Sequence, residues 1–254
     1  MVRTVIAKVP VYETMDGDGA RVKRPFPTRE QGPLDPFVML DEFDLSPPAG
    51  FPDHPHRGFE IITYMISGAF LHKDSVGNDR IIQAGSLQRI TVGRGIVHSE
   101  FPGTPQRNRG LQLWLNLPRH LKQIEPEYQE VTSDELPHMI NEGNMVTTIV
   151  GAGSPVELHT DVRYEDAQVA PGGNLRLGLP DGMTTLLYLL EGTLQMDEQI
   201  LTRDFLYVLS QEGTLEASAR LGCRFVVFAG KPHGEPIRMR GPFVDSEAVL
   251  IEPI

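Results

Sequence analysis

The alternation of short apolar runs with turn residues constrains this chain more than any other feature. Runs rich in β-branched and aromatic residues recur from residue 59 onward, and clusters of Gly, Pro, Asn and Asp separate them. Strands of this length and spacing are typical of a β-sandwich or barrel rather than of βαβ units. The sequence therefore predicts an all-β fold, with only brief helices near 119–124 and 133–136, where Pro residues stop any extension. The apolar runs are 59–66, 80–85, 86–92, 110–117, 145–151, 184–192, 200–209 and 224–230.

A weak internal repeat predicts two copies of one unit. The segments TYMISGAF (63–70) and LYLLEGTL (187–194) each place a Tyr four residues before a Gly inside an apolar strand. We therefore expect two barrels in tandem, with an N-terminal domain of residues 1–140 and a C-terminal domain of residues 141–254. The alternative interpretation is that the two segments are unrelated β-hairpins.

Composition excludes several classes of function. A formal net charge of −11 argues against direct binding of nucleic acid, because that affinity comes from clustered Lys and Arg. No run approaches the ~18 apolar residues of a membrane span, and the segment MVRTVIAKVP does not read as a signal peptide. The single cysteine, Cys223, cannot form an intrachain disulfide and fits a reducing compartment. We therefore expect a cytoplasmic protein without a membrane partner.

Two short motifs carry the chemistry. His54 and His56 lie in the segment GFPDHPHRGFE, and His98 and Glu100 lie in GRGIVHSEF. Residues two apart in a strand project to the same face, so each pair can point into a barrel. Two such pairs on neighbouring strands would make a pocket of four metal ligands. Imidazole and carboxylate without thiolate suit a divalent first-row metal better than a closed structural zinc site.

The same ligand set predicts an open and positively charged centre. Three neutral imidazoles and one carboxylate around a divalent ion leave about one positive charge, and an octahedral ion keeps two positions for outside ligands. Such a centre attracts an anionic oxygen and leaves room for dioxygen or water. The alternative is that these histidines are ordinary surface or core residues, since a single His-x-His is common. The presence of a second motif, His-x-Glu, favours a metal site over this alternative.

Longer motifs run through almost the whole chain. They are DPFVMLDEFD, GFPDHPHRGFE, GRGIVHSE, GLQLWLNLP, IEPEYQ and GEPIRMRGPFV. At these motifs the sequence resembles the pirin family of the cupin superfamily. That resemblance implies a bicupin of two barrels, with iron as the usual metal and one site in the N-terminal barrel on His54, His56, His98 and Glu100. The corresponding segments of the C-terminal half contain no His, so one metal ion per chain is expected.

The resemblance leaves a choice between two carboxylates. Glu60 lies four residues after His56, where the general cupin pattern HxHxxxE has its own carboxylate ligand. We favour Glu100 as the ligand and Glu60 as a group that orients a His or an Arg beside the site. Pirins commonly run beyond the point where this chain ends, at Ile254, so we carry over no function of a longer tail.

The resemblance also supplies the candidate activities. Some pirins are similar to quercetin 2,3-dioxygenases, which open the flavonol ring and release carbon monoxide, and some eukaryotic members act as nuclear transcriptional cofactors. The leading hypothesis is an iron-dependent dioxygenase of a small aromatic or enol-type substrate, with dioxygen as co-substrate and Glu100 or Glu60 as the base. Mn, Co, Ni, Cu or Zn could replace iron on the same ligands.

Two alternatives from other classes stay open. The first is a non-catalytic regulator that senses iron or redox state and binds a protein partner. The second is a cupin isomerase or another small-metabolite enzyme, because one fold and one ligand set host many chemistries.

Aromatic residues near the motifs have two interpretations. Trp114 is either a core residue or a wall for an aromatic substrate. Phe51, Phe59 and Phe101 flank the ligands closely enough in sequence to line an apolar mouth.

Other polar residues are expected to be structural. His72 and Asp74 precede the turn VGN and should be exposed at a hairpin, and Cys223 should be a buried, inert thiol. An acidic cluster is expected to be solvated or salt-bridged; it consists of Asp41, Glu42 and Asp44.

Overall fold

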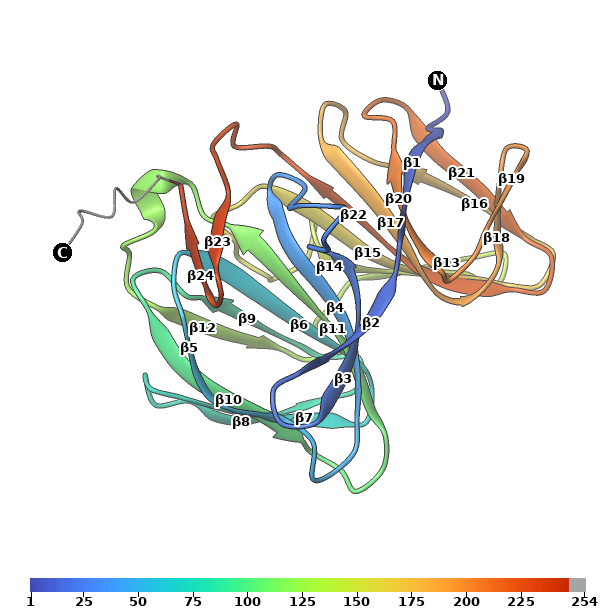
Figure 1. Ribbon diagram of the computed structural model, residues 1–254. Coiled ribbons are helices and arrows are strands. Elements are labelled where there is room, and N and C mark those ends of the chain that lie inside the picture. The colour runs from blue at the N-terminus through green and yellow to red at the C-terminus, as the bar shows by residue number, and fades with distance from the viewer. Residues whose placement is uncertain (247–254) are drawn as a thin grey trace.

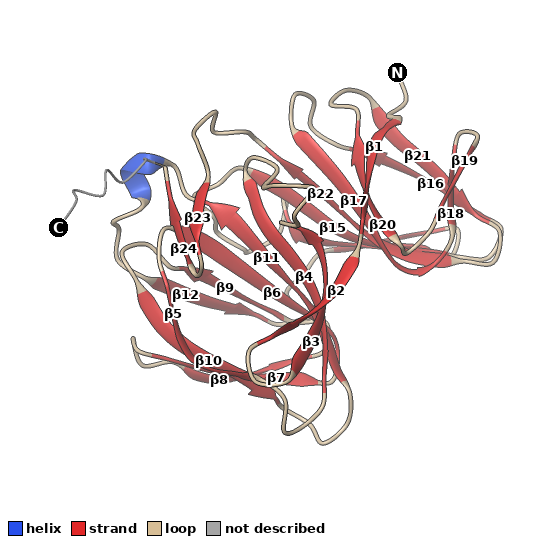
Figure 2. Ribbon diagram, viewed as in Figure 1, coloured by secondary structure: helices blue, strands red, loops and turns tan. Residues whose placement is uncertain are grey.

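The computed structural model describes residues 1–246, and these form antiparallel sheets with almost no helix (Figures 1 and 2). The all-β prediction is confirmed. The helix expected at 119–124 is a single 3₁₀ turn, η1 (Arg119–Leu121). Residues 133–135 form a turn rather than the expected helix, because the Glu135 carboxylate binds back to Thr132 and Pro137 follows. Within residues 1–246, no helix has the length and apolar character to cross a membrane.

The N-terminal barrel packs a seven-stranded sheet against a four-stranded sheet. The large sheet has the order β12-β9-β6-β11-β4-β3-β2, and the small sheet has the order β5-β10-β7-β8. The large sheet comprises β2 (Tyr12–Asp16), β3 (Ala20–Phe26), β4 (Phe37–Leu45), β6 (Phe59–Ser67), β9 (Leu87–Thr91), β11 (Asn108–Asn116) and β12 (Glu127–Val131). The small sheet comprises β5 (Phe51–His56), β7 (Ala69–Asp74), β8 (Asp79–Gln83) and β10 (Ile96–Pro102).

The C-terminal barrel has the same construction. Its large sheet has the order β1-β20-β17-β22-β15-β14-β13, and its small sheet has the order β16-β21-β18-β19. The large sheet comprises β1 (Val5–Pro10), β13 (His138–Asn141), β14 (Asn144–Val150), β15 (Val162–Val169), β17 (Thr184–Gly192), β20 (Phe205–Leu209) and β22 (Cys223–Gly230). The small sheet comprises β16 (Gly173–Gly178), β18 (Leu194–Met196), β19 (Gln199–Leu201) and β21 (Thr214–Ala219).

The repeated Tyr–Gly motif occupies equivalent places in the two barrels. It lies on β6 in the first and on β17 in the second, and each is the third strand from one edge of its large sheet. The glycines of the motif, Gly68 and Gly192, have left-handed φ angles of 72° and 71°. Glycine adopts this conformation without a steric penalty, so both strands can turn sharply at the same point. The prediction of two barrels in tandem is therefore confirmed.

The two ends of the described chain cross over to the opposite barrels. The N-terminal strand β1 pairs with β20 in the C-terminal barrel. A hairpin of β23 (Arg238–Arg240) and β24 (Phe243–Asp245) returns to the N-terminal barrel, where the Val244 amide donates to the Arg57 carbonyl at 2.9 Å. Figure 1 shows both crossings. The domain boundary at residue 140 stays a prediction, and residues 247–254 lie outside the described residues.

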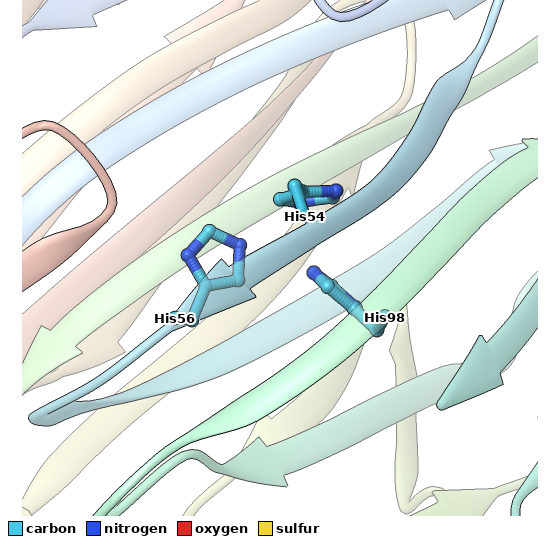
Figure 3. Close-up of side chains that lie close together, drawn as sticks. All are labelled: His54, His56 and His98. Carbon is cyan, nitrogen blue, oxygen red and sulfur yellow. The ribbon is translucent and has the colours of Figure 1, made fainter. Parts of the chain in front are cut away.

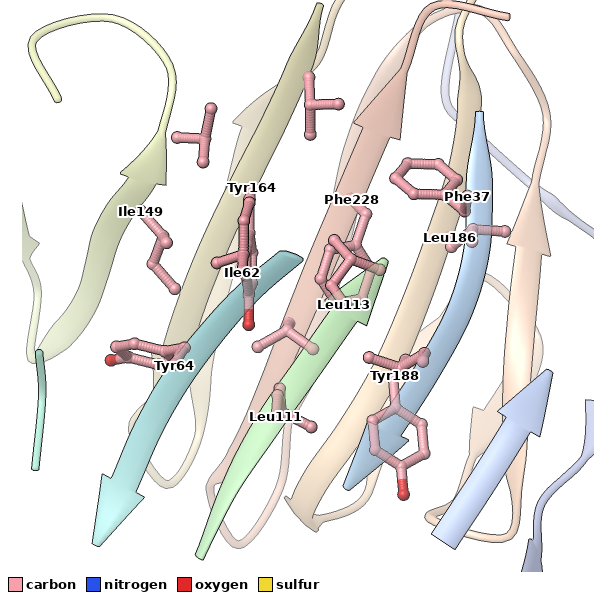
Figure 4. Packing of buried hydrophobic residues seen from close by; sticks show 14 of the residues in the cluster. Phe37, Ile62, Tyr64, Leu111, Leu113, Ile149, Tyr164, Leu186, Tyr188 and Phe228 are labelled. Carbon is pink, nitrogen blue, oxygen red and sulfur yellow. The ribbon is translucent and has the colours of Figure 1, made fainter. Parts of the chain in front are cut away.

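A shared hydrophobic core joins the two large sheets (Figure 4). Side chains alternate along β6: Ile62 and Tyr64 enter this shared core, whereas Phe59 and Ile61 pack inside the N-terminal barrel with Trp114. Full burial of each large apolar side chain stabilises a fold by roughly 1.5–3 kcal/mol. The shared core therefore stabilises the large sheet of the N-terminal barrel, whereas the predicted ligands lie on its small sheet.

Candidate metal centre

Strands β5 and β10 bring three of the predicted ligands together. They pair antiparallel, with His98 directly opposite His54, and His56 lies two residues further on the same strand as His54. The ring centroids lie 4.4 Å apart for His54 and His98, 4.6 Å for His54 and His56, and 4.9 Å for His56 and His98. One ligand nitrogen from each ring lies within 4.8 Å of the others. Figure 3 shows the three imidazoles converging between the strands.

Backbone carbonyls set the tautomers of His54 and His56. The Nδ1 atom of His54 lies 2.7 Å from the Pro52 carbonyl oxygen, and that of His56 lies 3.3 Å from the Pro242 carbonyl oxygen. A carbonyl can only accept, so each Nδ1 must carry the proton and each Nε2 keeps its lone pair. Metal-binding histidines commonly donate their other nitrogen in this way.

Burial keeps the inner two rings uncharged. Desolvation, followed by the nearby His54, lowers the pKa of His56 to about 3. Desolvation, followed by His56, lowers the pKa of His98 well below its usual value. The neutral imidazole is the form that binds metal. Within the described residues, Nε2 of His56 and both nitrogens of His98 are buried without a hydrogen-bond partner, which a metal ion would provide.

Glu100, the predicted fourth ligand, lies beside His98 and inside the barrel. Its carboxylate accepts from Nε2 of Gln88 at 2.6 Å and from Nε2 of Gln112 at 2.9 Å. Only 1% of the residue is exposed, and desolvation raises its pKa to about 7 against these two donors. A carboxylate oxygen of Glu100 lies within 4.8 Å of a ligand nitrogen of His98 and of His72. His98 therefore belongs to two groups of candidate ligands, one with His54 and His56 and one with His72 and Glu100.

Glu60 lies on the other face of the large sheet. Its carboxylate accepts from the Thr91 hydroxyl and from the backbone amides of His159 and Thr160, all at 3.1–3.2 Å. Alternation on β6 explains this placement, since Glu60 shares its face with Ile62 and Tyr64 of the shared core. The structure therefore does not bring Glu60 together with the three imidazoles.

The expectation that His72 and Asp74 are exposed is wrong. His72 is 1% exposed and faces Glu100 across the β7–β10 pair. Its Nε2 lies 3.1 Å from an Asp74 carboxylate oxygen, and its ring stacks on Tyr128 at 5.2 Å between centroids. The sequence did carry a signal, because Phe70, His72 and Asp74 alternate on one face of β7 and Phe70 is apolar.

A cavity of about 490 Å³ opens onto the centre. Its wall includes His54, His56 and Glu100, and its apolar part includes Trp114 and Phe51. Trp114 also stacks on the buried Phe59, with 4.2 Å between the ring centroids, and contacts His56 edge-on at 4.8 Å. Its indole ring therefore forms part of both the hydrophobic core and the cavity wall. Phe101 is partly exposed and is not part of this wall.

The hairpin β23–β24 forms one side of the same cavity. Met239, Gly241 and Pro242 line it, although they lie more than 180 residues after His56 in the chain. No local pattern in the sequence indicates this contact. The C-terminal segment thus contributes both to the wall and, through the Pro242 carbonyl, to the tautomer of His56.

The interior of the C-terminal barrel is filled by apolar side chains. Leu187, Leu189, Phe225 and Val227 belong to one core cluster there. Both groups of three candidate ligands found in residues 1–246 lie in the N-terminal barrel.

The acidic cluster is salt-bridged, as predicted. The Asp41 carboxylate accepts from Arg24 at 2.6 and 2.7 Å, and Arg109 lies 2.7 Å from the Glu42 carboxylate. Asp44 pairs with an Arg at the surface. All three carboxylates therefore form ion pairs with arginine side chains.

Two family models match the chain. The model described as Pirin matches residues 19–115, and the model described as Pirin C-terminal cupin domain matches residues 164–252. A pirin-like protein of Solanum lycopersicum is 41% identical over 95% of this chain and 86% of its own length. The chain belongs to the pirin family. The resemblance to the pirin family that the sequence motifs indicated is thereby confirmed.

Solved structures share the fold of this pirin. The crystal structure of quercetin 2,3-dioxygenase from Acinetobacter baumannii has a TM-score of 0.89 and 30% sequence identity, and the match covers 97% of this chain and 93% of that one. The bacterial pirin YhhW of Escherichia coli, solved in complex with nickel(II), has a TM-score of 0.74 and covers 89% and 99%. At 18% identity, the second likeness shows the fold alone.

Proposed function

We propose that this pirin is a metal-dependent dioxygenase that opens the ring of flavonol-type substrates, with iron as its metal. The observation that carries the proposal is the convergence of three imidazoles, beside a buried carboxylate, at a cavity of about 490 Å³. Small-molecule sites usually have volumes of roughly 300–1,000 Å³. The likeness to a quercetin 2,3-dioxygenase of Acinetobacter baumannii supports the reaction class.

The three imidazoles suit a single divalent ion, and Glu100 lies in a neighbouring group that shares His98 with them. His54 and His56 would hold it through Nε2, His98 through one of its unpartnered nitrogens, and Glu100 through an ionised carboxylate. A bound iron ion supplies a Lewis acid for an enolate-type oxygen and access to dioxygen chemistry. Mn, Co, Ni, Cu or Zn suits the same nitrogen and oxygen donors.

Glu100 is the base in this proposal. Without a metal ion, burial raises the pKa of Glu100 to about 7, so its carboxylate has a basicity suited to accepting the proton of the substrate 3-hydroxyl group near neutral pH. The amides of Gln88 and Gln112 donate to its two oxygens and so stabilise the ionised form. Glu60 has no such role here, because its carboxylate binds backbone amides on the far face of the sheet.

The apolar wall orients the substrate. Trp114 and Phe51 present aromatic surface to the cavity, and Met39 and Met239 add flexible thioether surface beside them. Flat aromatic rings pack well against such side chains, which also exclude water from the reacting atoms. A small aromatic or enol-type molecule, with dioxygen as co-substrate, matches these features.

The test is aerobic turnover of quercetin by iron-loaded protein. We expect loss of the flavonol absorbance together with release of carbon monoxide. His98→Ala should abolish both, whereas His120→Ala, an exposed histidine on η1, should leave both unchanged. Absence of turnover with iron, Mn, Co, Ni, Cu or Zn would reject the proposal.

Iron binding without turnover would instead favour the regulatory alternative. In that case the oxidation state of iron would alter a surface that binds a protein partner. Affinity purification with reduced and with oxidised protein separates the two functions, since a partner retained in one state only supports a sensor.

We also propose that the protein works in the cytoplasm. Cys223 is a buried free thiol in the described chain, and a chain with a single cysteine fits a reducing compartment. Fractionation of cells with an antibody to the protein tests the compartment directly.

A further inference from the structure

The hairpin β23–β24 has two contacts with the metal centre. The Pro242 carbonyl accepts from Nδ1 of His56 at 3.3 Å, and the hairpin residues Met239 and Gly241 line the cavity. Val244 is fully buried and packs in the cluster that contains Trp114 and Phe59. A shift of this hairpin would therefore change the presentation of His56 and the shape of the cavity together.

Lys122 binds the hairpin but does not line the cavity. It is 6% exposed and follows η1. Its Nζ donates to the Gly58 carbonyl at 2.8 Å, to Oδ1 of Asn116 at 2.7 Å and to the Val244 carbonyl at 3.2 Å. These acceptors belong to the segment after β5, to the end of β11 and to β24. One ammonium group thus links the strand that carries His56 to the hairpin.

The chemistry of Lys122 matches this role. An ammonium group has three N–H donors, and it meets three oxygen acceptors here. Burial lowers the pKa of Lys122 to about 8, so the group is still mainly protonated at pH 7. Gly58 allows the close approach, because a Cβ atom at that position would lie 2.1 Å from the Val244 carbonyl oxygen.

We propose that Lys122 is a positioning residue for the metal centre. By holding Val244 against Gly58, it keeps the Pro242 carbonyl on Nδ1 of His56 and thereby leaves Nε2 of His56 available to the metal. Lys122 does not line the cavity, so it acts through the hairpin rather than on the substrate. This inference rests on the metal site of the proposed function and adds to it a determinant outside that site.

A matched control separates this role from a general contribution to stability. Arg3 is also a buried cation, 1% exposed, and it donates to carbonyl groups, but it does so in the C-terminal barrel. Arg3→Met should therefore lower the free energy of unfolding and leave the metal centre unchanged. Lys122→Met removes all donors at similar side-chain length, Lys122→Arg keeps the charge, and Lys122→Gln is a milder replacement if the Met variant does not fold.

The first measurement is the tautomer of His56 in metal-free protein by long-range ¹H–¹⁵N NMR at pH 7. The native protein should show the proton on Nδ1, and Lys122→Met or Lys122→Gln should show a mixture with the Nε2–H form. Lys122→Arg should restore much of the native signal, and Arg3→Met should be native. A native tautomer in both Lys122→Met and Lys122→Gln would overturn the proposal.

The second measurement is the binding of Co(II), followed by its visible spectrum at a temperature well below unfolding. Loss of a group that orients a metal ligand typically weakens binding by about 10–100-fold. We expect a loss in that range and a changed spectrum for Lys122→Met, with no change for Arg3→Met. Equal losses in both variants would make Lys122 a structural residue only and would also overturn the proposal.

The two proposals can fail separately. If the native protein binds Co(II) but no metal form turns over quercetin, the dioxygenase is rejected and the Lys122 measurements are unaffected. If the native protein binds no Co(II), the metal site fails, and with it the inference about Lys122, whatever the tautomer.

Discussion

The Tyr188 hydroxyl donates to Oε2 of Glu42 at 2.6 Å, from the C-terminal barrel to the N-terminal barrel. The reciprocal contact runs the other way, from the Tyr64 hydroxyl to Oδ2 of Asp166 at 2.9 Å. Both tyrosines come from the repeated Tyr–Gly motif, and both belong to the shared core (Figure 4). Each carboxylate is also paired with an Arg of its own barrel. The barrels are therefore held in one relative orientation by two equivalent buried polar contacts.

Tyr188→Phe should lower the free energy of unfolding by about 1.5–3 kcal/mol, because it removes a buried hydrogen bond to a charged group. Urea unfolding followed by circular dichroism measures the loss. The matched control is Tyr164→Phe, a tyrosine of the same shared core whose buried hydroxyl has no hydrogen-bond partner within the described residues, so its loss should change the free energy of unfolding little. A loss at Tyr164 as large as that at Tyr188 would show that the hydrogen bond to Glu42 does not stabilise the contact between the barrels.

Gly58→Ala should displace the hairpin. Gly58 has a φ of +90°, and the added Cβ would meet the Val244 carbonyl oxygen, so strain and a clash act together. We expect faster proteolysis of the C-terminal segment and weaker Co(II) binding. Gly77→Ala is the control, since Gly77 has a φ of +101° with no atom within 4 Å of the added Cβ. That variant should show strain of roughly 1–3 kcal/mol but native metal binding.

The contribution of Glu100 to the stability of the metal-free protein should fall as pH rises through 7. Burial raises the folded-state pKa of Glu100 to about 7 from an ordinary value of 4.5. A raised pKa means that this carboxyl group contributes stability below pH 4.5 and loses that contribution as pH rises through about 7. Glu100→Gln cannot ionise, so its free energy of unfolding relative to native protein should increase between pH 5 and 8, by at most about 3 kcal/mol. A constant difference over that range would show that Glu100 titrates normally.

Gln112→Met should shift the pH dependence of turnover. The Gln112 amide donates to Glu100 and lowers the pKa of that carboxyl group, so its loss should raise the pKa further. The acidic limb of the kcat/KM profile should move to higher pH by about half a unit to one unit. Gln129→Met, at a glutamine that binds the Pro155 carbonyl instead, should leave the profile unchanged.

Local alternation explains which parts of this molecule can be predicted from its sequence. The period of two in β5 and β10 places His54 and His56, and then His98 and Glu100, on common faces, and the structure pairs His98 with His54. The same rule places Glu60 on the opposite face from Phe59, a distinction that the motif HxHxxxE does not reveal. The spacing of residues in a motif does not by itself predict which side chains can contact one another. That depends on the face of the sheet to which each side chain points.

Contacts between distant segments account for most of what sequence reasoning missed. His72 precedes a turn, and its alternation with Phe70 is a weak sign of burial that its pairing with Glu100 across β7 and β10 makes plain. Pro242, Val244 and Lys122 carry no local signature, because their role arises from a hairpin that returns to the other barrel. The family resemblance identified the motif GEPIRMRGPFV, yet the motif alone did not indicate a contact with His56.

The crossing of the chain ends also has a consequence for biosynthesis. Strand β1 is made first but must wait for β20, and the wall of the metal cavity is complete only when residues 239–242 have left the ribosome. The strands of both barrels end by Gly230, so the hairpin is added to the cavity wall only after the strands of both barrels have been made. The Pro242 carbonyl, which fixes the tautomer of His56, is therefore among the last parts of this cavity to be synthesised, whereas the three imidazoles are among the first.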